Sequence, residues 1–289
     1  MVLQAPHTSV TTNYGVRKGA CYYDKLTVSS PGAQAPPVIC GYNTGQHMWI
    51  PASDQCTSIN IDIDTGITTT TRKWQIKVSQ FECGNLKAPI EDCLQYFTAS
   101  TGTLATFNWD TSATTIATSQ THLMNQHYDM CIRRARSYCS FCLSPQIIST
   151  TTGTASSYGV SAGSNAPAPK NAIGSVCTGI TTAPGAVGYG DWIEIANLQP
   201  TIGTTGTIST ATRICGNVFN AISIATIASA TACSWAVPFK ISVHFDSLES
   251  VLTSCASPNL AKCENDVAAT SGAGYGTSGF YLAYWQNSC

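Results

Sequence analysis

Fourteen cysteines carry the most evident chemistry in this chain, and they run from Cys21 to Cys289. Their number is even, and no sustained zinc-finger spacing occurs among them. Cys139 and Cys142 form a Cys-x-x-Cys, a spacing found in redox and zinc sites, but they lack both a βαβ context and a second pair at zinc spacing. We therefore predict structural disulfides, which place the protein in an oxidising, extracellular compartment as a secreted chain.

Two short patterns match motifs of enzymes. Residues 159–163 satisfy the nucleophile pattern G-x-S-x-G, but a Ser/Gly-rich loop follows where a hydrolase needs a helix. Residues 274–279 satisfy G-x-G-x-x-G, but they precede an expected strand, whereas a dinucleotide site follows one. The histidines show no metal-site spacing: His7, His47, His122, His127 and His244. These patterns favour chance matches, and we expect no catalytic residue.

A small basic cluster consists of Arg133, Arg134 and Arg136, close to Tyr138 and Phe141. Arginine forks and aromatic stacking could recognise an acidic ligand there. A solvated strand face is the interpretation that the absence of a wider basic patch favours.

The overall composition argues against nucleic-acid and membrane partners. Only 10% of the 289 residues are charged and the formal net charge is -1, so no global field attracts polyanions or anionic lipid. No apolar stretch near 20 residues is present, so we expect no membrane insertion. The length favours two domains.

Alternating apolar and polar residues indicate strands over residues 59–64, 74–78 and 239–245. Thr-, Ser-, Gly- and Ala-rich stretches at residues 68–71, 149–168 and 201–212 favour loops. No amphipathic helix is expected, so the chain is predicted to be all-β.

Four features occur twice in the same order, which indicates an internal repeat. They are an acidic residue that opens an alternating strand (residues 24–28 and 191–195), Ile-Cys-Gly (39–41 and 214–216), a strand that ends in Asp (59–64 and 239–246) and a further alternating strand (74–80 and 280–286).

These features resemble the CUB domain, whose second half runs through Cys, Asp-x-hydrophobic, Cys-Gly and Gly-Phe-x-x-x-Tyr; residues 279–284, GFYLAY, match the last element. Further segments are similar to a group of secreted arthropod CUB proteins: CGYNTGQHM (40–48), CLQYF (93–97), FNW (107–109) and YDMCIR (128–133). The resemblance implies disulfide-rich, antiparallel, jelly-roll-like β-sandwiches of CUB type. Residues 1–82 would form only the C-terminal half of one unit, and residues 83–289 a complete, loop-enlarged one.

A half unit would leave strand edges without neighbours. Three explanations remain open from the sequence: the chain extends upstream of Met1, residues 1–20 supply a strand, or a neighbouring copy adds one.

The resemblance also implies particular sites. It pairs Cys21 with Cys40 and Cys177 with Cys215, and it leaves the other ten cysteines open. Many CUB domains hold Ca²⁺ with three acidic residues, for which Asp129, Asp191 and Asp246 are the candidates here, Asp129 standing where the family has Glu. In the first unit, Asp24 and Asp64 correspond to the last two.

The function expected from these observations is a non-enzymatic extracellular structural or adhesive CUB protein. Its partners would be proteins, with copies of itself first, because low charge permits assembly into an oligomer or filament. The alternative is a calcium-dependent protein- or glycan-binding accessory module of a secreted protease system.

Overall fold

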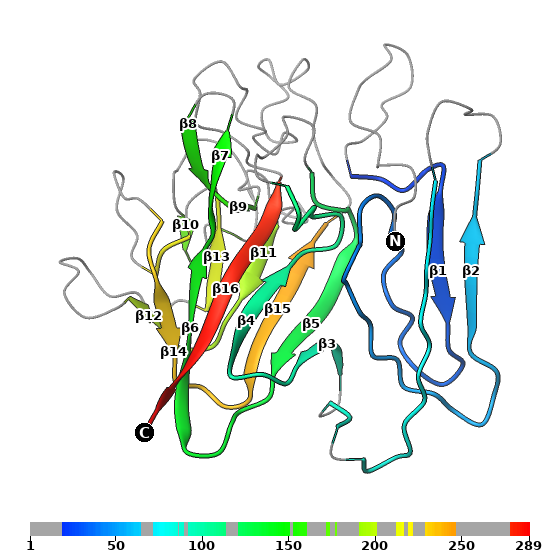
Figure 1. The fold of residues 1–289 in the computed structure, drawn as a ribbon, viewed down its shortest axis with the longest axis horizontal. Helices are drawn as coiled ribbons and strands as arrows, with labels where there is room; N and C mark the ends of the chain where they lie inside the picture. Colours follow the sequence, from blue (N-terminus) through cyan, green and yellow to red (C-terminus); the bar gives the residue numbers. More distant parts are fainter. Residues whose placement is uncertain are drawn as a thin grey trace, which may run out of the picture.

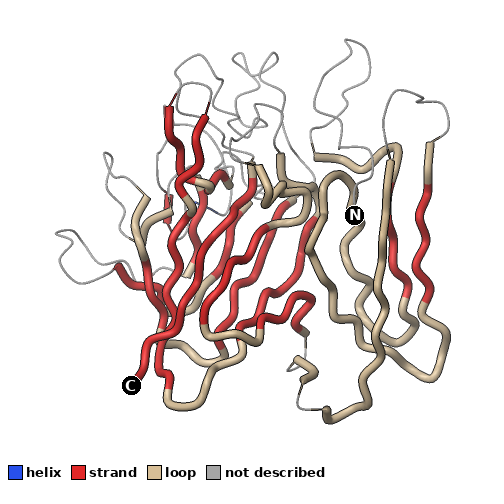
Figure 2. Tube along the Cα trace, in the orientation of Figure 1, coloured by secondary structure: helices blue, strands red, loops and turns tan. Residues whose placement is uncertain are grey.

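The computed structural model describes residues 19–64, 72–85, 87–89, 92–113, 121–150, 153–160, 172–173, 177, 191–200, 212–216, 219–221, 229–246 and 278–289. Over these residues the chain is built from strands and loops, without an α-helix, as Figure 2 shows. The described part of the chain thus offers no helix of the length and hydropathy that a membrane crossing needs.

Two sheets form most of the molecule (Figure 1). The first sheet contains, in spatial order, β10 (Ala172–Ile173), β13 (Arg213–Cys215), β11 (Trp192–Glu194), β15 (Phe239–Phe245), β5 (Gln126–Ile132) and β3 (Cys93–Phe97). The second contains β12 (Leu198–Pro200), β14 (Ala232–Ser234), β6 (Tyr138–Pro145), β16 (Gly279–Ser288) and β4 (Thr101–Ala105), with β9 (Tyr158–Gly159) pairing to β16. A separate pair, β1 (Lys25–Ser29) and β2 (Ser58–Asp62), lies beside them in Figure 1.

The core lies between the two large sheets because their strands alternate in burial. In β15, Phe239, Ile241, Val243 and Phe245 are buried, while Lys240 between them is exposed. The apolar residues of β16 that alternate in the same way belong to the same buried cluster. The expected all-β sandwich is therefore confirmed.

Five disulfides join ten of the described cysteines: Cys21–Cys40, Cys93–Cys131, Cys139–Cys289, Cys142–Cys233 and Cys177–Cys215. They include both pairs that the resemblance implies. Cys139 and Cys142 bond to two different strands, so this Cys-x-x-Cys is structural, as expected. The bridges contribute on the order of 2–4 kcal/mol each to stability, mainly by restricting the unfolded chain.

Three expectations about elements need correction. The loop expected at residues 149–168 is wrong for the described residues 149–150 and 153–160, where β7 (Ile147–Thr150) and β8 (Gly153–Ser156) form a hairpin and β9 follows. The Thr-rich composition also suits strands, since Thr is β-branched. Not every strand pair is antiparallel, because β3 runs parallel to β5.

The third correction concerns residues 74–78, which form no strand although they alternate. Every residue from 73 to 85 is exposed in the structure. An alternating segment becomes a strand only when a neighbour receives its backbone hydrogen bonds and its apolar face. The counterpart segment, β16, has such neighbours in β6 and β4.

Candidate functional site

A buried aspartate joins the ends of β11 and β15. Asp191 precedes β11 and Asp246 follows β15, and the register that pairs Trp192 with His244 brings these two strand ends together. Asp191 Oδ1 accepts the backbone N–H of Asp246 at 2.7 Å, and the Asp191 side chain is fully buried. A carboxylate withdrawn from water needs such donors.

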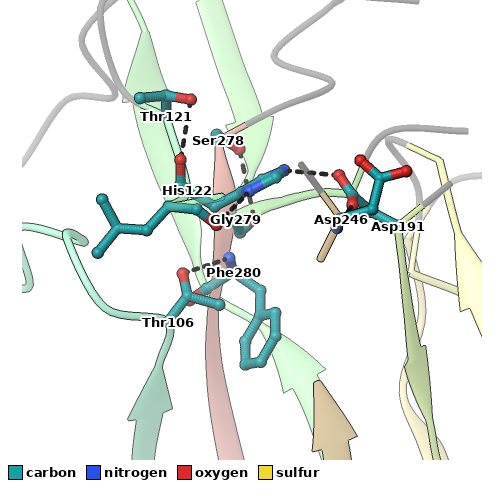
Figure 3. A network of polar contacts seen from close by, with 9 residues as sticks. Thr106, Thr121, His122, Asp191, Asp246, Ser278, Gly279 and Phe280 are labelled. Atoms are coloured by element: carbon teal, nitrogen blue, oxygen red, sulfur yellow. Dashed lines mark hydrogen bonds and ion pairs between the residues drawn. The ribbon is translucent and has the colours of Figure 1, made fainter. Parts of the chain in front are cut away.

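His122 supplies the other partner of Asp191 (Figure 3). Its Nε2 lies 3.1 Å from Asp191 Oδ2, and both side chains are fully buried. The imidazole packs on Phe245 of β15, with ring centroids 4.1 Å apart, and its Nδ1 lies 3.3 Å from the carbonyl oxygen of Leu123. The ring is thus fixed by contacts on both nitrogens and on one face.

Neighbouring backbone contacts tie further segments to the same end of the sandwich. Asn125 donates its N–H to the Asp246 carbonyl at 2.8 Å, and Phe280 donates its N–H to Thr106 Oγ1 at 3.2 Å. Gly279, which starts β16, has a φ of +84°, and a Cβ there would lie 2.3 Å from Thr106 Oγ1. Glycine is therefore the residue that this approach admits.

The same arrangement recurs around Asp24, with a different basic partner. Asp24 precedes β1, and its Oδ1 accepts the N–H of Asp64 at 3.0 Å. Its Oδ2 pairs with Arg72 Nε at 2.5 Å, and Arg72 Nη2 donates to the Asp64 carbonyl at 2.8 Å. Lys25 pairs with Asp62 as Trp192 pairs with His244, so the register is the same. We call these two arrangements the Asp24 clasp and the Asp191 clasp.

The clasps hold segments of the fold together, because their polar groups contact one another inside the protein. The Asp191 clasp joins three segments that are distant in the sequence, and the Asp24 clasp joins Asp24 to Asp64 and Arg72, which lie eight residues apart. Neither presents a nucleophile or an acid–base pair to solvent, since both carboxylates are fully buried.

The residues expected to bind calcium are only partly brought together. Asp191 and Asp246 meet, but both oxygens of Asp191 already contact the Asp246 amide and His122. Asp129 lies within β5 opposite Ser242 and pairs with Lys240 at 3.0 Å. In the described ranges, no three His, Cys, Asp or Glu residues are arranged to hold a metal ion. Asp129 therefore does not join the other two candidates in this arrangement, and calcium binding by these residues stays a prediction.

The basic cluster lies on the turn between β5 and β6. Arg133, Arg134 and Arg136 are exposed, and Arg133 donates to the Thr98 carbonyl at 3.1 Å. Phe141 is buried against Phe239, so of the two aromatic residues named beside the arginines only Tyr138, which is half-buried, reaches the surface.

The remaining motifs have no enzymatic geometry in the described structure. Gly159 and Val160 lie at β9 and in a bridge to Gly216, while residues 161–163 fall outside the described residues. Residues 274–277 also fall outside them, and Ser278 leads directly into β16.

The resemblance singled out Asp191, Asp246, Asp24 and Asp64 as candidate ligand positions, but the sequence identified neither basic partner. Arg72 follows β2, whereas His122 precedes β5, so the partners occupy unrelated places in the repeat and no shared pattern identifies them.

Comparison with known proteins gives one family. The model of the animal CUB domain matches residues 90–287. Two solved structures are similar at low identity: the CUB1-EGF-CUB2 domain of human MASP-1/3 (13% identity, 97% of this chain, 86% of that chain, TM-score 0.25) and the CUB1-EGF-CUB2 domains of rat MASP-1 (12%, 96%, 84%, 0.26). At these TM-scores the likeness carries no argument. No curated protein matches. Because the family match spans more than half of the sequence, the chain belongs to the animal CUB domain family.

Proposed function

We propose that this chain is a secreted, non-catalytic structural or adhesive module that acts through protein–protein contacts. CUB domains generally mediate such contacts in extracellular proteins. The proposal includes membership of the secreted arthropod group, on the motifs quoted above.

One observation carries the proposal: large apolar side chains are exposed on the first unit. We call this set the apolar strip: Ile59, Ile63, Trp74, Ile76, Val78 and Phe81, each 38% to 66% exposed. Exposed apolar groups gathered in one part of a soluble protein typically mark an interaction surface.

Copies of the same chain are the partners we propose for the purified protein. The formal net charge of -1 opposes close approach of like chains very little. Burying the apolar strip between copies would remove its side chains from water, which stabilises an oligomer or filament.

Light scattering on the native, non-reduced protein tests this proposal, with negative-stain imaging of the same sample. We expect a particle larger than the 30.5 kDa chain, unchanged by EDTA. Trp74→Ser should shift the particle toward the monomer. Trp235→Ser is the matched control, because Trp235 lies outside the apolar strip and is 47% exposed against 48% for Trp74.

A monomer at all concentrations would contradict self-association. A change of mass on adding EDTA would instead favour the calcium-dependent accessory module that binds a protein or glycan in a secreted protease system. Equal effects of the two tryptophan substitutions would show that the apolar strip is not the contact surface.

A further inference from the structure

Corresponding segments of the two units differ in how far their apolar side chains are buried by neighbouring strands. In the second unit, Phe280 and Leu282 of β16 are fully buried, and β15 buries every second residue. In the first unit, the segment corresponding to β16 exposes Trp74 by 48% and Val78 by 66%. The strand corresponding to β15, which is β2, is exposed along most of its length. The first unit therefore presents a surface that the second unit covers with its own strands.

The cysteines identify which strand does the covering. Cys21, Cys40 and Cys56 of the first unit and Cys83, directly after it, correspond in order to Cys177, Cys215, Cys233 and Cys289 in the second. The first two of each set form the same disulfide. Cys83 follows Gln80 at the spacing at which Cys289 follows Gln286, and Cys56 and Cys233 each lie shortly before the strand that ends in the clasp.

In the second unit, the last two cysteines of this set both bond to β6. Cys289 bonds to Cys139, and Cys233 bonds to Cys142, which lies opposite it in the strand register. Strand β6 lies between β14 and β16 in its sheet. The single strand β6, with its Cys-x-x-Cys, is thus bonded by two disulfides to the two segments beside it.

The counterpart cysteines Cys56 and Cys83 are free and exposed. Residues 19–64 and 72–85 contain only the strands β1 and β2, so the described part of this unit has no counterpart of β6. In Figure 1, β2 starts and the segment 72–85 ends at the lower end of the unit, just as β15 starts and β16 ends at the lower end of the sandwich.

We propose that the apolar strip accepts a β-strand with Cys-x-x-Cys from a partner chain, and that this strand bonds covalently to Cys56 and Cys83. By analogy with β6, it runs antiparallel to residues 74–80; its first cysteine bonds to Cys83 and its second to Cys56. A second folded copy cannot supply this strand, because its own Cys139 and Cys142 are already bonded. The partner that fits is a chain that carries such a strand with two free cysteines and alternating apolar residues around them.

This inference rests on the proposed role in protein–protein contact and names the chemistry of the partner. Each new disulfide joins two thiols and releases two electrons and two protons. A low-molecular-mass disulfide, such as oxidised glutathione, accepts them and becomes two thiols. Strand addition positions the thiols, and backbone pairing together with apolar burial favours the bound state.

The test uses the full chain and a synthetic peptide that copies residues 137–146, which include β6. In a glutathione buffer we expect one peptide to couple per chain, about tenfold or more faster than a scrambled peptide that keeps Cys-x-x-Cys, because docking raises the effective thiol concentration. Peptide mapping should find the first peptide cysteine on Cys83 and the second on Cys56. Cys56→Ser should leave only the bridge to Cys83.

Several outcomes would overturn the inference: equal coupling of the scrambled peptide, the reverse pairing, or failure of a thiol alkylating reagent to label Cys56 and Cys83 in the native chain. Coupling also covers the apolar strip, so it should return any self-associated particle to the monomer. If the peptide couples but the free chain is already monomeric, self-association fails and this inference stands. If the chain self-associates but the peptide does not couple, self-association stands and this inference fails.

Discussion

At the scale of single residues, a buried aspartate has the same contacts in both clasps, but its basic partner differs. In both, the aspartate accepts the amide of a second aspartate and faces a nitrogen of a basic side chain. The partners differ in exposure: His122 is fully buried, while the Arg72 side chain is 15% exposed. Water can therefore compensate a lost partner more readily in the Asp24 clasp.

We predict that Asp191→Asn destabilises the protein by about 1–3 kcal/mol, because an amide has one acceptor oxygen where the carboxylate has two, so either the Asp246 N–H or the His122 ring loses its contact. Asp24→Asn should cost less, since Arg72 reaches solvent. Urea unfolding followed by tryptophan fluorescence measures both changes. Asp110→Asn is the control, because the contacts of its carboxylate are with exposed Ser112. Equal values for all three variants would contradict a stabilising role of the clasps.

At the scale of elements, the sequence predicted those strands whose neighbours lie within the described chain. The alternation of residues 239–245 matches β15, and that of residues 280–286 lies within β16, because each is buried between strands that receive its backbone groups. The same kind of alternation at Trp74 and Val78 predicted a strand that the structure lacks. The alternation of apolar and polar residues shows that a segment can form a strand with one buried face, but whether it does so depends on a neighbouring strand that pairs with it. The family resemblance implied that Asp191 and Asp246 lie close together, whereas nothing in the sequence indicated the approach of His122 to Asp191.

The start of β16 offers a test of how tightly an element can depend on one glycine. We predict that Gly279→Ala costs several kcal/mol, because it combines a positive φ with a Cβ 2.3 Å from Thr106 Oγ1. Gly45→Ala shares the positive φ of +80° but meets nothing within 4 Å, so it should cost only about 1 kcal/mol. The difference between their unfolding midpoints in guanidinium chloride measures the cost of the steric clash with Thr106 alone. Identical midpoints would show that β16 shifts freely away from Thr106.

At the scale of the whole molecule, a histidine links the first unit to the first sheet of the sandwich. His47 Nε2 accepts the backbone N–H of Tyr96 in β3 at 2.9 Å, and its ring lies 5.1 Å from that of Phe97. Burial lowers the pKa of His47 below its ordinary value of 6.5. Burial also lowers the pKa of His244, with nearby His127 as the next cause. Both histidines are therefore harder to protonate in the folded protein than in the unfolded chain.

The sign of the resulting pH dependence follows from proton uptake. Above pH 6.5 both states hold these histidines neutral, so they contribute nothing. Below it, the unfolded chain takes up protons first, and stability falls by at most about 1.4 kcal/mol per histidine one pH unit lower. Urea unfolding at about pH 7.5 and 5.5, above the usual carboxyl range, measures this loss. His47→Gln should reduce it, because glutamine keeps an acceptor for Tyr96 and does not titrate, and His47→Gln with His244→Gln should reduce it further. Stability that stays constant or rises between these two pH values would contradict the prediction and would mean that protonated His47 keeps its place beside Tyr96.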